Sequence, residues 1–223
     1  MKLLKPALAV ILSLTFFNVQ AAKVETEQEK ISYALGVFFG QNFARQGLEI
    51  NTPAFMQAIE DVLTNTDLKL TPDELKTVMT TFQNQQQEKQ NNQAKNNKAN
   101  GEKYLAENKK KEGVKVTESG LQYKVVKQGE GKKPSSDSQV VVHYRGTLID
   151  GTEFDSSYAR GEPVTLGVNQ VIQGWQEALP QMAEGSKWQI VVPSDLGYGA
   201  RGAGGTIGPN ATLLFDIELI EVK

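Results

Sequence analysis

The chain has 223 residues, and its 24 lysines and arginines against 26 aspartates and glutamates give a formal net charge of −2. That balance offers no basic surface for nucleic acid, and a hydrophobic content of 39% is too low for a bundle of membrane helices. The absence of cysteine excludes disulfides, thiolate metal sites, cysteine nucleophiles and cysteine-linked lipid anchors. The single histidine, His143, argues against a histidine metal site and against a serine–histidine triad.

The first 21 residues are typical of a secretory signal. Lys2 and Lys5 precede an apolar run from Ala7 to Phe17, and Val19-Gln20-Ala21 supplies residues that are tolerated at a cleavage site. The run is too short to cross a bilayer comfortably. We expect residues 1–21 to be removed, with an uncleaved N-terminal anchor as the alternative. The mature chain would then have no transmembrane segment and would lie in the periplasm or outside the cell, where an association with the outer membrane stays open.

Residues 22–70 are expected to be helical. Thr26-Glu27-Gln28-Glu29 fits a capping box, and Gly47 is placed to end the helix that starts there. Apolar residues recur at helical spacing between them, as at Ile31, Leu35 and Phe38. A second helix is expected to begin at Thr52-Pro53, since proline suits the first helical turn.

This helical region is small, and it carries apolar side chains that a unit of its size rarely buries alone. We therefore expect it to form a homodimer interface. The side chains expected at that interface are Phe38, Phe39, Phe43, Phe55 and Ile59. The Gly36-x-x-x-Gly40 spacing either allows two helices to approach closely or is merely tolerated in a single helix.

A long polar segment, residues 71–112, follows. It opens with another capping box at Thr71-Pro72-Asp73-Glu74, but from Gln83 to Asn100 nearly every residue is Gln, Asn, Lys or Glu. A stretch of this kind has no apolar face to bury, so it predicts either a solvated helical spacer or a disordered linker. Gly101 is the expected weak point of such a helix.

From Gly113 to Lys223 the pattern changes to strands. Val140, Val142 and Tyr144 alternate with more polar neighbours, and Asp150-Gly151 is a strong signal for a hairpin turn. One short helix is expected near Gly174–Leu179. The predicted fold class is α+β: a C-terminal antiparallel sheet wrapped around one short helix, preceded by an all-α N-terminal region and a long linker helix.

Three segments carry a family resemblance. VVHYRGTLIDGTEFDSS (residues 141–157), VIQGWQEALPQMAEGSKWQIVVPSDLGYG (171–199) and IGPNATLLFDIEL (207–219) resemble the FKBP-type peptidyl-prolyl cis-trans isomerases. The helical half, with ISYALG and its long polar helix, is similar to the N-terminal dimerisation module of Mip-like (macrophage infectivity potentiator-type) proteins. The resemblance implies an enzyme that accelerates rotation about X–Pro bonds in exported polypeptides and so assists their folding.

The resemblance also implies a site built from aromatic residues. Trp175 would form the floor beneath the proline ring, and Tyr198 would donate a hydrogen bond to a substrate carbonyl. Asp155 would accept hydrogen bonds inside the pocket and help to orient either Tyr144 or the ligand. The remaining expected walls, rim and cap are Tyr144, Phe154, Phe215, Val171, Ile172 and Ile207. No metal or organic cofactor is implied, and macrolide inhibitors are expected as ligands.

One departure from the family pattern lies after Gly161-Glu162-Pro163. Val164, Thr165 and Leu166 stand there in place of an aromatic-rich strand, so we expect a thinner pocket wall.

The chemistry of the reaction agrees with such a site. Rotation about a peptide bond faces a barrier of about 18–20 kcal/mol because the planar amide is stabilised by resonance. The twisted amide is less polar, so a dry apolar pocket favours it over the planar form. The alternative function is a chaperone or peptide-binding module in which the pocket grips clients and isomerisation is secondary.

Overall fold

A computed structural model describes residues 24–223, and the expected signal segment lies outside them. The chain forms two compact units, of which the first ends at Phe55 and the second runs from Met56 to Lys223. The boundary falls within a helix. Each unit is described by itself.

Helix α1 (Glu27–Gln46) begins and ends as expected. Thr26 Oγ1 accepts a hydrogen bond from the Glu29 amide at 3.2 Å, while the Glu29 carboxylate accepts from the Thr26 amide at 2.8 Å. Gly47 closes the helix in the left-handed region, with φ of 61°. No residue of α1 is buried in the single chain. Helix α2 (Thr52–Leu63) starts at the expected residue and is capped by the side chain of Asn51.

Helix α3 (Pro72–Asn108) contains the whole polar run, so the helical interpretation is confirmed and the disordered one is wrong. Gly101 does not interrupt the helix; it is buried. The expectation that this stretch has no face to bury was also wrong. Residues spaced alternately three and four apart form a partly buried face that packs on the sheet domain of the same unit: Ala94, Asn97, Gly101, Tyr104 and Asn108.

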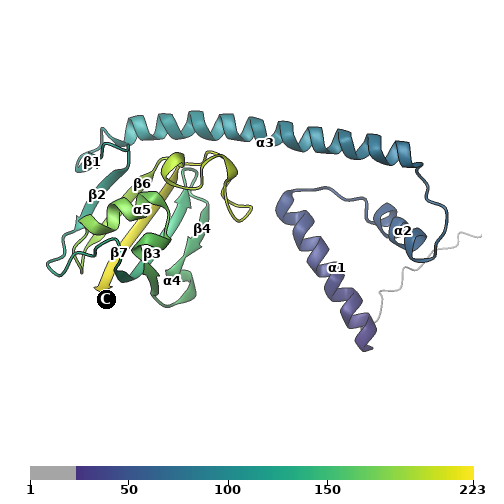
Figure 1. Cartoon of the computed structure of the whole chain (residues 1–223), viewed down its shortest axis with the longest axis horizontal. Coiled ribbons are helices and arrows are strands. Elements are labelled where there is room, and N and C mark those ends of the chain that lie inside the picture. Colours follow the sequence, from purple (N-terminus) through teal and green to yellow (C-terminus); the bar gives the residue numbers. More distant parts are fainter. Residues whose placement is uncertain (1–23) are drawn as a thin grey trace, which may run out of the picture. The chain divides into compact units, whose positions relative to one another are not determined.

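The sheet is antiparallel throughout, and Figure 1 shows it beside the C-terminal half of α3. Its strands are β1 (Val114–Val116), β2 (Gln122–Lys127), β3 (Gln139–Leu148), β4 (Glu153–Ser156), β5 (Val164–Gly167), β6 (Lys187–Val192) and β7 (Leu213–Val222). The order is β1-β2-β6-β7-β3-β4, and β5 pairs with β3 as well. One edge of β3 is therefore shared, because residues 139–142 pair with β5 and residues 145–147 with β4.

Helix α5 (Gln173–Ala178) is the expected short helix, and it buries Trp175 and Ala178 against the sheet. The predicted alternation holds, since Val140, Val142 and Tyr144 of β3 are buried. The other side chains that meet in this core include Ile190, Val192, Leu213, Phe215, Ile217 and Leu219. The expected fold class is confirmed.

The prediction of a single short helix in this region was wrong. Helix α4 (Ser157–Arg160) follows β4 directly; Ser156 Oγ caps it by accepting from the Ala159 amide at 3.2 Å, and Gly161 ends it with φ of 79°. Four residues are too few to show a helical period in a sequence. Short 3₁₀ turns also occur at Val168–Gln170, Leu179–Gln181, Ser194–Leu196 and Gly199–Arg201. Within residues 24–223, no helix is both long and apolar enough to cross a membrane.

Candidate functional site

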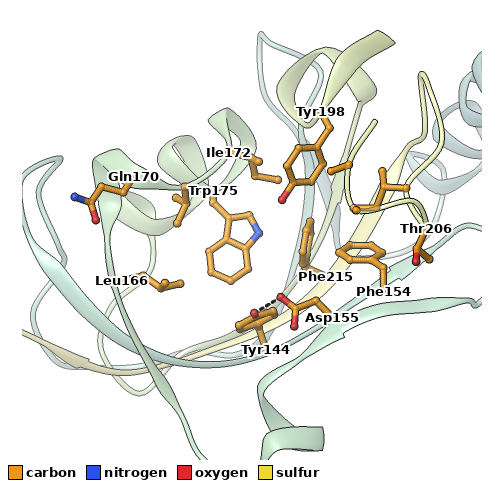
Figure 2. Close-up of a pocket in the computed structure, with 14 residues that line it drawn as sticks. Tyr144, Phe154, Asp155, Leu166, Gln170, Ile172, Trp175, Tyr198, Thr206 and Phe215 are labelled. Carbon is orange, nitrogen blue, oxygen red and sulfur yellow. Dashed lines mark hydrogen bonds between the residues drawn. The ribbon is translucent and has the colours of Figure 1, made fainter. Parts of the chain in front are cut away.

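A cavity of about 580 Å³ opens between α5, the sheet and the loop before β7. All nine residues that the sequence nominated line it: Tyr144, Phe154, Asp155, Val171, Ile172, Trp175, Tyr198, Ile207 and Phe215. Figure 2 labels seven of them, all but Val171 and Ile207, and shows these seven around a common space, although the nine come from six different segments of the chain. The topology accounts for this convergence, because β3, β4 and β7 are neighbours in the sheet on which α5 packs.

Trp175 forms the floor of the cavity. Its indole is only 3% exposed and packs edge-to-face against two other aromatic rings. The ring centroids of Tyr144 and of Phe215 each lie 5.3 Å from that of Trp175, with interplanar angles of 88° and 84°. Edge-to-face pairs of this kind are favourable beyond the area they bury, so the floor is held in one orientation.

One wall consists of Phe154 and Phe215, which pack at right angles with centroids 5.5 Å apart. This packing requires glycine at position 146 of β3. A Cβ atom there would lie 2.6 Å from the Phe154 ring and 2.9 Å from the Phe215 ring. Gly146 therefore lets both rings close over the strand.

The polar corner of the cavity is a three-residue network. The Tyr144 hydroxyl donates to Asp155, and Arg160 of α4 donates to both, at 2.5 Å to Asp155 Oδ1 and 2.9 Å to the Tyr144 hydroxyl. Ser157 holds the Tyr144 backbone: its Oγ accepts from the Tyr144 amide at 2.7 Å. Sequence reasoning missed Arg160, since the short helix that carries it gives no periodic signal.

These contacts shift the ionisation of the corner. Burial raises the pKa of the Asp155 carboxyl, but the hydrogen bonds from Tyr144 and Arg160 outweigh burial, and the pKa lies below its usual 3.8. Burial, helped by the Asp155 carboxylate, raises the pKa of the Tyr144 phenol above 10. The same two partners raise the pKa of Arg160. Asp155 is therefore an anion and Tyr144 a neutral donor throughout the physiological range.

The rim is formed by Tyr198 and by the segment that contains Ile207. Tyr198 is 41% exposed, and Figure 2 shows its hydroxyl directed into the cavity. Within residues 24–223 that hydroxyl has no hydrogen-bond partner, so it is available to a ligand. Ile207 is buried and is held by a two-residue bridge to Ala203, with N–O distances of 2.8 and 3.0 Å.

Five further residues line the cavity; sequence reasoning placed only Leu166 of these in a pocket wall and missed the other four. The five are Leu166, Gln170, Ala203, Gly204 and Thr206. Leu166 of β5 occupies the wall where an aromatic strand was missing, so that side of the cavity is aliphatic. In the described part of the chain, no three histidine, aspartate or glutamate side chains are grouped as metal ligands.

The cavity thus combines an aromatic floor, aliphatic and aromatic walls, one anionic corner and the hydroxyls of Tyr198 and Thr206, which have no hydrogen-bond partner within residues 24–223. It contains no serine, cysteine, lysine or histidine that could act as a nucleophile. Such a site can bind a small apolar ring and hold a neighbouring carbonyl.

Comparison with known proteins agrees with this chemistry. The family model described as the domain amino terminal to FKBP-type peptidyl-prolyl isomerase matches residues 28–125. The model for FKBP-type peptidyl-prolyl cis-trans isomerase matches residues 130–220. The outer membrane protein MIP of Legionella longbeachae is 43% identical over 228 residues, covering 100% of this chain and 98% of that protein.

Two further relatives extend the match. The peptidyl-prolyl cis-trans isomerase Mip of Coxiella burnetii is 40% identical over 226 residues, covering 100% of this chain and 98% of its own. The crystal structure of FkpA from Escherichia coli superimposes with a TM-score of 0.64 at 36% identity, over 90% of this chain and 99% of that one. The resemblance seen in the three sequence segments is confirmed: this chain belongs to the FKBP-type peptidyl-prolyl cis-trans isomerases and accelerates rotation about X–Pro bonds.

Proposed function

We propose that the cavity above Trp175 is where this isomerase rotates X–Pro bonds, and that its substrates are proline-containing segments of exported polypeptides. The observation that carries the proposal is the free Tyr198 hydroxyl at the rim of a cavity whose aromatic floor is buried. The proline ring would rest on Trp175 between Phe154 and Phe215. Tyr198 would donate a hydrogen bond to a substrate carbonyl that flanks the X–Pro bond as it twists.

The geometry explains how rotation would be accelerated. A twisted amide has lost resonance and is less polar than the planar ground state, so removing water stabilises the twisted form relative to the planar one. Tyr198 adds a fixed donor that holds the flanking backbone while the bond turns. Asp155 and Arg160 keep Tyr144 pointing along the floor. No covalent bond is made or broken in this reaction, so the site needs no nucleophile.

The test is the cis-to-trans rate of a short Ala-X-Pro-Phe peptide. Tyr198→Phe removes one hydroxyl from the rim, and we expect kcat/KM to fall by about 2- to 10-fold, the range expected for a lost hydrogen bond. The matched control is Tyr158→Phe, which removes an exposed hydroxyl that binds Glu218 outside the cavity. Equal kcat/KM values for the two variants and the unmodified protein would show that the Tyr198 hydroxyl has no role in the reaction.

A second function, holding unfolded clients, is favoured by the apolar side chains that α1 exposes. Phe38 is 58% exposed and Phe39 46% in the single chain. A dimer through these helices would offer two cavities to one client, and avidity would strengthen binding. Suppression of client aggregation should then survive Tyr198→Phe but weaken when Phe38 becomes serine; the opposite pattern would assign the holding activity to the cavity.

The proposed location is the periplasm or the cell exterior, which rests on the signal-like first 21 residues. The name of the Legionella longbeachae relative, an outer membrane protein, supports a place in the cell envelope. The cavity is also the proposed site for macrolide inhibitors. Leu166 in place of an aromatic wall predicts weaker binding of such ligands than a fully aromatic cavity would give.

A further inference from the structure

The segment between the last 3₁₀ turn and β7, residues 202–212, contacts both the cavity and helix α3. Ala203, Gly204, Thr206 and Ile207 line the cavity. The residues that follow them, 208–212, lie against α3 within the same compact unit. One short stretch therefore connects the helix to the rim of the proposed proline site.

The contact with α3 is polar and close. Asn97 Nδ2 donates to the Pro209 carbonyl at 2.8 Å, and Asn210 Nδ2 approaches the Ala94 carbonyl at 3.5 Å. Gly208 lies so near the helix that a Cβ atom there would be 2.6 Å from Gln93 Nε2. Asn97 itself is half-buried, whereas its neighbour Asn96 is exposed.

The segment has few anchors of its own. Three glycines, Gly202, Gly204 and Gly205, all have positive φ and give the backbone wide freedom before folding. Its internal restraints are the Ala203–Ile207 bridge and the hydrogen bond from the Asn210 amide to the Gly199 carbonyl at 2.9 Å. In residues 24–223 the Pro209 carbonyl accepts from no group other than Asn97.

The same helix also borders the hairpin that leads to Phe154. A small cavity of about 120 Å³ is enclosed by Gln93 and Asn97, by the β3–β4 turn at Leu148–Asp150, and by the segment before β7. Both chain segments that carry rim or wall residues thus approach the helix at one place. The described contacts make α3 a support for that side of the site.

We propose that Asn97 is a positioning residue of the isomerase: by holding the Pro209 carbonyl it fixes the segment that places Ile207 and Thr206 over the cavity. The inference rests on the proposed assignment of the cavity as the proline site. It implies that the functional isomerase domain begins within α3, near Gln93, and not at residue 113, and that the helix contributes to catalysis without touching substrate.

The test uses the full chain and three substitutions at one position. Asn97→Asp keeps the shape but has no N–H to donate, Asn97→Ala removes the amide, and Asn97→Gln restores a donor on a longer side chain. Asn96→Ala is the control, because it makes the same change in helix propensity on the exposed side. The measurements are KM and kcat for the proline peptide, the melting temperature, and the amide resonances of Ala203–Ile207.

We expect Asn97→Asp and Asn97→Ala to lower kcat/KM by about 2- to 10-fold, the range for one lost hydrogen bond, mainly through a higher KM. The amide resonances of the segment should shift, the glutamine variant should recover part of the activity, and Asn96→Ala should behave as the unmodified protein. A melting temperature that changes by no more than the control's would separate positioning from general destabilisation.

Wild-type activity in Asn97→Asp and Asn97→Ala would overturn the inference, as would an equal loss in Asn96→Ala. A loss of activity with unchanged resonances in the segment would also overturn it. These outcomes are distinct from failure of the proposed site itself. If the proposed site is wrong, Tyr198→Phe will be fully active as well. If Tyr198→Phe is impaired and Asn97→Ala is fully active, only the role of the helix is rejected.

Discussion

At the scale of single residues, the polar corner shows how a surface cation can set the ionisation of a cavity. Arg160 is exposed, yet it reaches both Asp155 and Tyr144. The nine nominated residues could be found from the sequence because they lie in the three segments that resemble the FKBP-type isomerases. Arg160 could not be found in this way, since nothing in Ser157–Arg160 distinguishes a four-residue helix from a loop until Asp155 and Tyr144 are seen beside it.

The lowered pKa of Asp155 predicts that kcat/KM stays constant as the pH falls from neutral into the mildly acidic range. A group with a depressed pKa stays charged below its ordinary value, so its contribution is present above pH 3.8 and is lost only as pH falls through the folded-state pKa. We expect kcat/KM to be constant from pH 8 to about 5. Acid loss of activity with a midpoint near pH 6 would contradict the assignment.

Replacing Arg160 by Gln should move that profile. Without the guanidinium, the pKa of Asp155 should rise, and Tyr144 should lose one of its two hydrogen-bond partners. We expect kcat/KM at neutral pH to fall by about 2- to 10-fold and the acid limb to shift to higher pH. Arg145→Gln is the control, because Arg145 pairs with Glu153 on the exposed side of β3 at 2.7 Å. If both variants have the same pH profile of kcat/KM as the unmodified protein, Arg160 plays no part in the reaction.

At the scale of elements, α3 is the clearest case in which the amino-acid composition left two structures open. Its run of Gln and Asn suits both a solvated helix and a disordered linker, because neither depends on an apolar stripe. The helix packs through hydrogen bonds and close approach instead: Gln122 Nε2 donates to the Leu105 carbonyl at 2.9 Å, and Asn108 Nδ2 donates to Gln122 Oε1 at 2.9 Å. Hydropathy patterns carry no signal for a face of this kind.

Gly101 tests this packing. In a solvated helix, Gly101→Ala should stabilise by about 1 kcal/mol, from helix propensity alone. Here the new Cβ would lie 2.3 Å from Thr212 Oγ1, so we expect the free energy of unfolding of the isomerase unit to fall by about 1–3 kcal/mol. Urea denaturation followed by tryptophan fluorescence would measure the change.

Two partner variants make the result specific. Adding Thr212→Ala to Gly101→Ala removes the clashing oxygen and should restore most of the lost stability, a coupling that a double-mutant cycle isolates. Asn100→Ala, one position away and exposed, should be neutral or slightly stabilising. Stabilisation by Gly101→Ala would indicate that the helix does not pack on Thr212 in solution.

At the scale of the whole molecule, the first unit cannot be explained as a self-contained domain. Its aromatic rings form a chain of contacts from Phe38 to Phe39, Phe43 and Phe55, yet α1 buries none of its residues. The sequence indicated this imbalance, because a short amphipathic region with several phenylalanines lacks the partners that would cover them. Within the single described chain these rings stay largely exposed, as Phe38 and Phe39 show, so a second copy of the chain is the proposed cover.

We predict a homodimer through this unit. Light scattering at micromolar concentration should give twice the chain mass, and replacing both Phe38 and Phe39 by serine should give the monomer. Isomerisation of a short peptide should be unchanged, because the cavity lies in the other unit. Val126→Ser, which removes an exposed apolar side chain of β2, should leave the dimer intact. A monomeric unmodified chain would defeat the prediction.

The make-up of the cavity has a consequence for durability. None of its fourteen lining residues contains sulfur, and none is a lysine or histidine whose charge changes near neutrality. Oxidants that convert thiols or thioethers would find no target at the site. The isomerase activity proposed for this cavity should therefore persist in an oxidising medium and vary little near neutral pH. If the protein acts in the periplasm or outside the cell, as proposed, such a site would need no protection by the reducing agents of the cytoplasm.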